Sequence, residues 1–181
     1  HICYGYCVSD GSLFALKSEL SYLWTVNIGM ALENIRKWQW INRMNEKINR
    51  MWKYDMLTQV LNRSGFFYCA ETILQKIKEE KSNAFIIFLD IDGLKSVNDN
   101  LGHEIGDAFI AKIAGILKEV VPKDCLIMRY GGDEFVVFGS CKQAGRMQRI
   151  AEDIKAAIKT ADQKENRSYH LAASLGCSLH K

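Results

Sequence analysis

Carboxylates gather in two short stretches of this 181-residue chain, and each stretch adjoins an apolar run. In LDIDGLKSVNDNLGHEIGD, residues 89–107, Asp90 closes the apolar run. In RYGGDEFVVF, residues 129–138, Asp133 and Glu134 follow two glycines. A buried carboxylate is costly unless a cation or hydrogen-bond donors lie nearby. Because carboxylates completed by water and phosphate oxygens are the usual ligands of Mg²⁺ on a nucleotide, the two stretches indicate a Mg²⁺–phosphate site.

The residue types suggest separate roles within such a site. Asp90 and Asp133 are candidate metal ligands, and Lys95 is a candidate to bind the phosphates through its positive charge. Asn98 and Asp107 carry the hydrogen-bonding groups to contact a nucleobase. Taken singly, each of these residues is explained better by a polar loop with Asx turns, and Asp107 by a helix cap. The concentration of polar groups in one loop favours a site.

The two glycines predict a tight hairpin. Gly131 and Gly132 allow positive φ, and they let a ligand or another backbone approach without a Cβ in the way. Asp133 and Glu134 then begin the second hairpin strand, on opposite faces of it by the period of two. A plain hairpin with two surface acids is the alternative interpretation.

The rest of the pattern predicts the elements that would position these residues. The continuous apolar run AFIIFLDID is typical of a strand buried on both faces, and a polar, glycine-containing loop follows it. The other predicted elements are a short strand in residues 1–10, a helix from Ser18 to about Met56, a helix from the Asn62–Gly65 turn to about Lys81, a helix over 107–121, a β-hairpin of CLIMRY and FVVFGS, a helix over 146–162 and a strand over 169–180. From residue 66 the order α-β-α-β-β-α-β predicts an α/β (α+β) fold, in which helices cover a central mixed sheet.

Composition excludes several classes of function. The net charge of +3 is spread without a basic block, so nucleic-acid binding has no electrostatic support. The six cysteines form no C-x-x-C pair, which is typical of reduced thiols in a cytosolic protein. The most apolar early segment, residues 13–32, carries Lys17 and Glu19 and is too interrupted to span a bilayer, so no membrane segment is expected in this chain.

The long N-terminal helix has an apolar seam that changes register. Ile41, Met44, Ile48 and Met51 recur at three and four residues, whereas the apolar residues before Ile41 are spaced by threes. This pattern fits a single amphipathic helix packed on its own domain. It fits a paired, coiled-coil helix that connects two domains equally well.

Three motifs, in order and over residues 55–181, resemble those of the GGDEF family of diguanylate cyclases. RYGGDEF matches the signature for which the family is named. DMLTQVLNR resembles its D-x-L-T-x-L-x-N-R opening. DIDGLKSVNDNLGHEIGD resembles its D-x-D-x-F-K-x-x-N-D-x-x-G-H-x-x-G-D segment, with Leu94 where Phe is usual. The set is far more specific than any one motif.

The resemblance implies a fold like the palm of nucleotide cyclases and polymerases, and the condensation of two GTP molecules to cyclic di-GMP and two pyrophosphates. Site residues follow by position. Asp90, the carbonyl of Ile91 and Asp133 would hold Mg²⁺ or Mn²⁺, with Glu134 as a candidate second metal ligand. Lys95 would contact the phosphates, and Asn98 and Asp107 would hydrogen-bond the guanine. His103 would lie in the nucleotide-binding segment, and the nucleotide would lie against Gly131 and Gly132.

The resemblance also implies an organisation of the chain. One domain would hold one GTP, so catalysis requires a homodimer, most simply with two-fold symmetry. Residues 1–29 resemble the end of a GAF-type sensor. Residues 30–54 would be a helical linker, with a coiled coil as one interpretation, and residues 55–181 would be a GGDEF domain that lacks a last helix of the family. A bacterial cytoplasmic location is expected.

One departure from the family affects regulation. Many members carry an R-x-x-D product-inhibition site before the hairpin, and Pro122-Lys-Asp-Cys125 stands there instead, so inhibition at that site should be absent. Two other interpretations remain: an inactive domain that acts as a receptor for GTP or a cyclic dinucleotide, and a signalling scaffold without a ligand.

Overall fold

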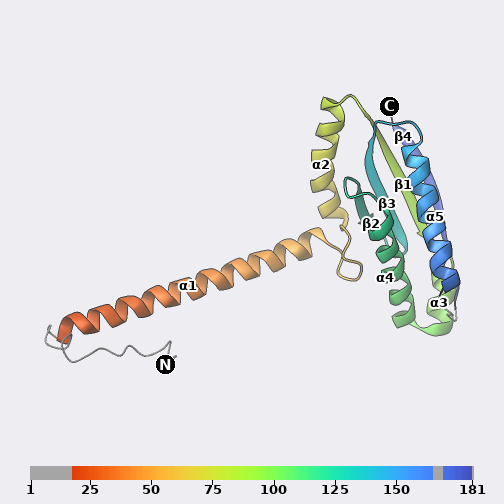
Figure 1. Ribbon diagram of the computed structural model, residues 1–181. Coiled ribbons are helices and arrows are strands. Elements are labelled where there is room, and N and C mark those ends of the chain that lie inside the picture. Colours follow the sequence, from red (N-terminus) through yellow and green to blue (C-terminus); the bar gives the residue numbers. More distant parts are fainter. Residues whose placement is uncertain (1–17, 165–168, 181) are drawn as a thin grey trace. The chain divides into compact units, whose positions relative to one another are not determined.

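The computed structural model describes residues 18–164 and 169–180, with side chains from residue 22 onward. The chain divides into two compact units, residues 1–49 and 50–181. A single 36-residue helix, α1 (Ser18–Lys53), accounts for the described part of the first unit and ends in the second (Figure 1). The strand expected in residues 1–10 lies outside the described residues.

The second unit contains the predicted elements and one further helix. Its elements after α1 are α2 (Arg63–Glu79), β1 (Asn83–Ile91), α3 (Leu94–Leu101), α4 (His103–Val120), β2 (Leu126–Arg129), β3 (Glu134–Cys141), α5 (Arg146–Lys164) and β4 (Ala173–His180). The polar stretch expected as a loop is therefore helical, as α3 and the first turn of α4. The reason is that Leu94 and Val97, three residues apart, are both buried and anchor α3 to the core. Gly93 and Gly102, at φ 76° and 89°, bound α3 at its two ends.

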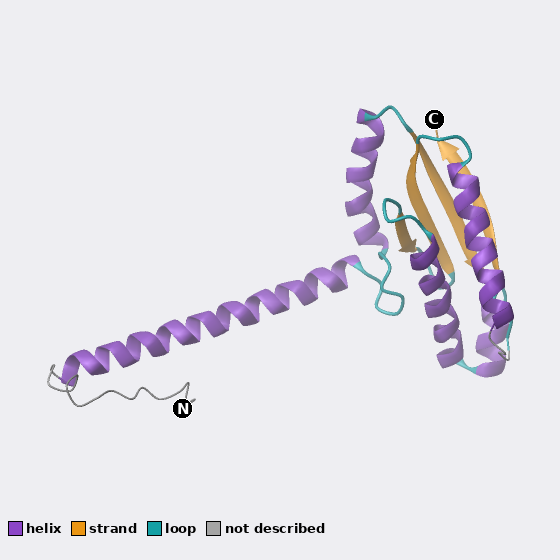
Figure 2. Ribbon diagram, in the orientation of Figure 1, coloured by secondary structure: helices purple, strands orange, loops and turns teal. Residues whose placement is uncertain are grey.

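The four strands form one sheet in the order β2-β3-β1-β4. All three pairings among the four described strands are antiparallel, so these strands do not form the mixed sheet that was expected. The connection through α3 and α4 makes β2 run in the same direction as β1, but the hairpin strand β3 lies between them. The α/β (α+β) architecture of a palm-like sheet with helices over it, preceded by a long helix, is confirmed (Figure 2).

Each face of the sheet is packed against different helices. On one face, Phe85, Ile87 and Leu89 of β1 join apolar residues of α4 and α5 in the larger core. On the other face, Val136 and Phe138 of β3 pack with apolar residues of α2 in a smaller cluster. Because side chains alternate along a strand, the continuous apolar run of β1 faces both layers. The helices thus hold the strand ends that carry the two motifs.

Asn62 joins the last turn of α1 to the first turn of α2. Its side-chain oxygen accepts a hydrogen bond from the backbone N–H of Gly65 at 2.9 Å, which caps α2. Its amide nitrogen donates to the carbonyl of Trp52 at 2.9 Å and to two neighbouring carbonyls at 3.3 Å. Gly65 has no room for a side chain, because a Cβ there would overlap the carbonyl of Lys53. One asparagine therefore satisfies the end of one helix and the start of the next.

Candidate functional site

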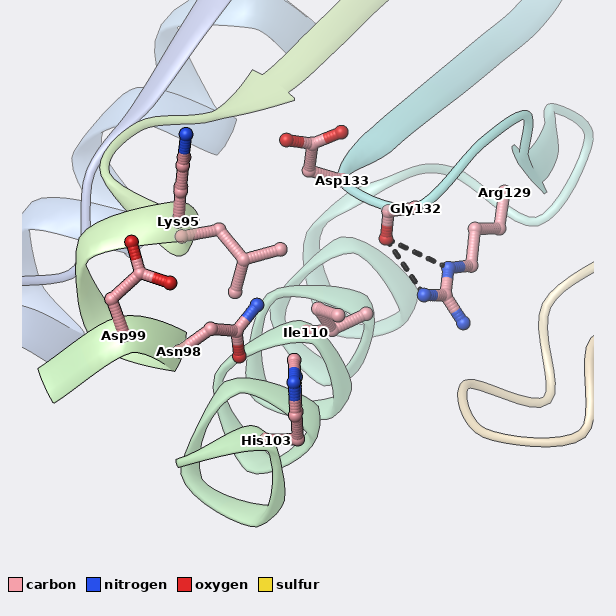
Figure 3. A pocket seen from close by; sticks show the side chains of 9 residues that line it. Lys95, Asn98, Asp99, His103, Ile110, Arg129, Gly132 and Asp133 are labelled. Carbon is pink, nitrogen blue, oxygen red and sulfur yellow. Dashed lines mark hydrogen bonds between the residues drawn. The ribbon is translucent and has the colours of Figure 1, made fainter. Parts of the chain in front are cut away.

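A pocket of about 360 Å³ lies between α3, the start of α4 and the β2–β3 turn (Figure 3). The residues that line it are Leu94, Lys95, Asn98, Asp99, His103, Ile110, Arg129, Gly132 and Asp133. Both motif-bearing stretches contribute to this lining, although 21 residues, 108–128, separate them in the sequence. The apolar floor from Leu94 and Ile110, with polar groups around it, is the usual composition of a small-molecule site.

Helix α3 supplies three polar residues of the pocket. Lys95, Asn98 and Asp99 are spaced by three and four residues, so they share the helix side that faces away from buried Val97. In Figure 3, Asn98 extends from α3 toward α4, and His103 lies at the start of α4 below it. The predicted phosphate and base residues Lys95, Asn98 and His103 are thus brought together.

Arg129 fixes the glycine turn. Its guanidinium donates to the carbonyl of Gly132 at 2.7 Å and to the carbonyl of Gly131 at 3.2 Å. The turn is also closed by the N–H of Tyr130, which donates to the carbonyl of Glu134 at 2.8 Å. Neither Gly131 nor Gly132 has the positive φ that a glycine allows. Gly131 does not line the pocket, and the side chain of Glu134 lies over its Cα.

The same arginine binds a carboxylate 74 residues away in the sequence. Arg129 donates to both carboxylate oxygens of Asp55, at 3.2 and 3.3 Å. Thr58 donates to Asp55 from its hydroxyl at 2.6 Å and from its N–H at 2.9 Å. Burial opposes ionisation of Asp55, but the hydrogen bonds from Thr58 and Arg129 outweigh it and hold the pKa of this carboxyl below its ordinary value. The loop after α1 is therefore tied to the turn that carries Asp133.

The four predicted metal-binding residues lie at adjoining strand ends. Asp90 of β1 is paired directly with Glu134 of β3, and the N–H of Ile91 donates to the carbonyl of Asp133 at 3.1 Å. Asp133 lines the pocket, whereas Asp90, Ile91 and Glu134 do not. No cluster of three metal-ligating side chains occurs within residues 18–164 and 169–180.

The donor set fits a hard divalent cation. Carboxylates directly opposite each other on neighbouring strands repel, as Asp90 and Glu134 do here. Within the described part of the chain, no side chain donates a hydrogen bond to Asp90, Glu134 or Asp133, and none forms an ion pair with them. Carboxylate and backbone carbonyl oxygens are the ligands that Mg²⁺ takes alongside phosphate oxygens. A cation at these strand ends would offset the repulsion.

Asp107 is the predicted base-reading residue that lies outside the pocket lining. It is exposed and stands one turn beyond His103 on the same side of α4. Asp107 is not an N-terminal helix cap, which was the alternative explanation for this residue, because α4 begins at His103. Asp107 therefore lies on the same side of α4 as the pocket residue His103, outside the pocket lining.

Four pocket residues were not predicted from the sequence. Leu94, Asp99, Ile110 and Arg129 line the pocket without having been assigned to it. Asp99 is next to Asn98 and Arg129 is next to the glycine turn, so their proximity in sequence to predicted site residues was the only indication that they belong to the pocket. Leu94 and Ile110 gave no signal, because apolar residues that form a pocket floor have the same pattern as core residues.

Comparison with known proteins places the fold and the motifs in a family. The profile of the GGDEF domain of diguanylate cyclases matches residues 52–181. The crystal structure of the coiled coil and GGDEF domain of DgcB from Caulobacter crescentus, in complex with cyclic di-GMP, superimposes with a TM-score of 0.75 at 22% identity, over 87% of this chain and 84% of that one.

Two curated relatives come from staphylococci. An uncharacterised membrane protein of Staphylococcus epidermidis is 31% identical over 146 residues, and one of Staphylococcus aureus is 30% identical over the same length. The match covers 81% of this chain but only 39% of each relative.

These relatives contradict the expected cytoplasmic location, because both are membrane proteins. Within the described residues, no helix is long and apolar enough to cross a membrane. The cytoplasmic expectation rested on the resemblance to the family, with which the composition agreed, and neither of these reports whether a family member is attached to a membrane.

The three motifs, the palm-like sheet and the profile match over residues 52–181 agree on one assignment. The chain belongs to the GGDEF-domain family of diguanylate cyclases.

Proposed function

We propose that this protein is a diguanylate cyclase, which condenses two GTP molecules to cyclic di-GMP and two pyrophosphates. The observation that supports this most is the pocket of about 360 Å³, in which Lys95, Asn98, His103 and Asp133 meet from both motifs. A cation, an amide, an imidazole and a carboxylate around an apolar floor suit a nucleoside triphosphate. Family membership and the fold support the same reaction.

Each residue has a role that its place allows. Lys95 binds phosphate oxygens, and Asn98, together with Asp107 one turn beyond His103, hydrogen-bonds the guanine edge. His103 lines the pocket as part of the nucleotide-binding segment, and the backbone at Gly132 would border the nucleotide, with Gly131 beside it in the turn. Little covalent chemistry is asked of these side chains, because phosphoryl transfer depends on positioning and charge stabilisation.

The cofactor is Mg²⁺ or Mn²⁺. Asp90, the carbonyl of Ile91 and Asp133 would hold it, with Glu134 as a second carboxylate at the same strand ends. When bound, the ion would polarise the attacking 3′-hydroxyl and neutralise charge on the α-phosphate. Arg129 keeps the backbone of the turn in place, so that the carboxylate of Asp133 stays at the edge of the pocket.

The product requires two domains. Each pocket binds one GTP, and cyclic di-GMP contains two equivalent phosphodiester bonds, so a homodimer with two-fold symmetry can form both. We assign residues 30–54 to the helical linker that pairs the domains, residues 1–29 to the end of an upstream sensor that regulates the pairing, and residues 55–181 to the GGDEF domain.

The decisive experiment is chromatographic detection of cyclic di-GMP after incubation of this chain with GTP and Mg²⁺. Asp133→Ala should reduce the rate at least 100-fold, because the metal loses a ligand at the reacting phosphate. Asp153→Ala, an exposed acid on α5, is the matched control and should synthesise at the wild-type rate. Equal rates in wild type and Asp133→Ala would contradict the assignment of the metal site.

A second function has one observation in its favour. Asp90 and Glu134 do not line the pocket, so a nucleotide can be held without the complete metal site. A domain that binds GTP or a cyclic dinucleotide without turnover would act as a receptor. Mg²⁺-dependent GTP binding without any cyclic di-GMP would select this function over the cyclase.

A further inference from the structure

Gly106 stands in the first turns of α4 although its backbone does not require a glycine. Its φ is not positive, in contrast to Gly93 and Gly102. A glycine with ordinary helical angles is less favourable inside a helix than alanine, because it loses more conformational freedom on folding. Something other than backbone geometry must explain why this position lacks a side chain.

The space beside Gly106 is filled by Asn98. A Cβ added at Gly106 would overlap the amide oxygen of Asn98 and would come within 2.9 Å of its Cγ, while the amide nitrogen would be 3.5 Å away. Two atoms of one planar group would be displaced, so a small adjustment would not relieve the overlap. Asn98 would have to turn away, or α3 would have to separate from α4.

Asn98 is the pocket residue that Gly106 supports from behind. It is half-buried and lines the pocket, whereas Gly106 is buried and does not line it. In Figure 3, the amide of Asn98 points from α3 toward α4. The amide oxygen lies against Gly106, so the position of the Asn98 side chain depends on the space that this glycine leaves open. The orientation of an amide decides which of its atoms donates and which accepts toward a ligand.

We propose that Gly106 is a positioning residue for nucleobase recognition: the absence of a side chain at Gly106 seats the Asn98 amide against α4. This inference rests on the proposed function, in which Asn98 contacts guanine. It predicts that the base specificity of the pocket depends on a residue that touches no ligand. Positioning to within a fraction of an ångström is typically supplied by such supporting residues.

The chain contains a matched control for the test. Gly115 lies in the same helix, also without positive φ, and a Cβ there would meet nothing within 4 Å. Gly115→Ala and Gly106→Ala therefore make the same chemical change in α4 with and without contact to Asn98. A guanosine triphosphate analogue whose α–β phosphate bridge cannot be cleaved would be titrated with Mg²⁺ into the wild type and both variants by calorimetry.

We expect Gly106→Ala to raise the Kd of the guanine analogue about tenfold, and Gly115→Ala to leave it within twofold. The adenine analogue should be affected less, so that discrimination between the two bases falls. A wild type that binds no guanine nucleotide would contradict both this inference and the proposed function. A wild type that binds, with Gly106→Ala unchanged, would overturn the inference alone.

A double-mutant cycle separates positioning from general damage to the fold. With Asn98→Ala the overlapping atoms are gone, so Asn98→Ala/Gly106→Ala has room for the new methyl group and should fold even if Gly106→Ala does not. The double variant should bind the guanine analogue as weakly as Asn98→Ala and no more weakly. Additive losses would show that Gly106 acts by another route and would overturn the proposal.

Discussion

At the scale of single residues, Arg129 and Asp55 show how the motifs depend on one another. Arg129 belongs to the hairpin motif and Asp55 to the motif that follows α1, and their side chains form an ion pair at 3.2 Å. The arginine also donates to both glycine carbonyls of the turn. Since a bidentate arginine orients two partners at once, a change at Asp55 should reach the turn that carries Asp133.

The hydrogen bonds at Asp55 predict a dependence of stability on pH. Because the folded state holds the pKa of Asp55 below its ordinary value, its contribution to the free energy of unfolding is fully present above about pH 4 and is lost as pH falls through the lowered pKa. The stability difference between wild type and Asp55→Asn, measured by urea unfolding at several pH values, should therefore shrink below about pH 4. A constant difference down to pH 2 would contradict this.

Asp124 provides an independent instance of the same effect. Its hydrogen bond from Arg146, at 2.6 Å, lowers the pKa of the Asp124 carboxyl. Asp124→Asn should reproduce the acid-side behaviour without affecting the pocket, whereas Asp153→Asn should change the free energy of unfolding by less than about 0.5 kcal/mol at neutral pH. Only Asp55→Asn should also impair nucleotide turnover, because only Asp55 is connected to the hairpin turn.

At the scale of elements, Asn62 is the point where α1 and α2 are joined. Asn62→Ala removes the cap of α2 and the donor to the last carbonyls of α1, so we expect a loss of about 1–2 kcal/mol in the free energy of unfolding. Asn100→Ala is the control, because the amide of Asn100 donates only to Ser96 within α3. Equal unfolding midpoints for the two variants in urea would show that the junction contributes nothing.

The close packing of β3 at Gly139 predicts a second effect at the scale of elements. A Cβ at Gly139 of β3 would lie 2.7 Å from the sulfur of Cys125 and 3.0 Å from the ring of Phe85. Gly139→Ala should therefore destabilise the domain by about 1–3 kcal/mol through overpacking. At Gly176 of β4 a Cβ meets nothing within 4 Å, so Gly176→Ala should be neutral or slightly stabilising. Thermal unfolding of both variants compares them directly, and a loss at Gly176 equal to that at Gly139 would contradict the packing explanation.

Local patterns predicted most elements, and tertiary contacts account for the rest. The continuous apolar run of β1 and the periodic apolar face of α5 were sufficient to predict both elements. Helix α3 was missed because only Leu94 and Val97 among its eight residues are buried, too few for a visible period. The motifs predicted that Lys95, Asn98, His103 and Asp133 belong to one site; all four line the same pocket, and their roles stay predictions. The contact of Arg129 with Asp55 spans 74 residues, and no local pattern encodes such a pairing.

At the scale of the whole molecule, the proposed reaction needs two copies of the chain. In α1, the apolar residues Ile41, Ile48 and Met51 recur at heptad spacing and are 49%, 56% and 62% exposed. Burial of such side chains in a paired helix would stabilise a dimer by up to about 1.5–3 kcal/mol each. The exposed seam therefore provides a surface on which two copies can associate.

Dimer-dependent catalysis predicts that cyclic di-GMP synthesis per chain rises with protein concentration and levels off once the dimer is saturated. Ile48→Lys places a charge on the seam and should raise the dissociation constant of the dimer at least tenfold, measured by analytical ultracentrifugation. The concentration at half-maximal specific activity should shift by the same factor. Asn49→Lys adds the same charge to an exposed residue of α1 on the side away from the seam and should shift neither value. Specific activity that is independent of concentration in the wild type, or a weakened Ile48→Lys dimer with an unchanged activity curve, would mean that the two pockets do not need α1 to meet.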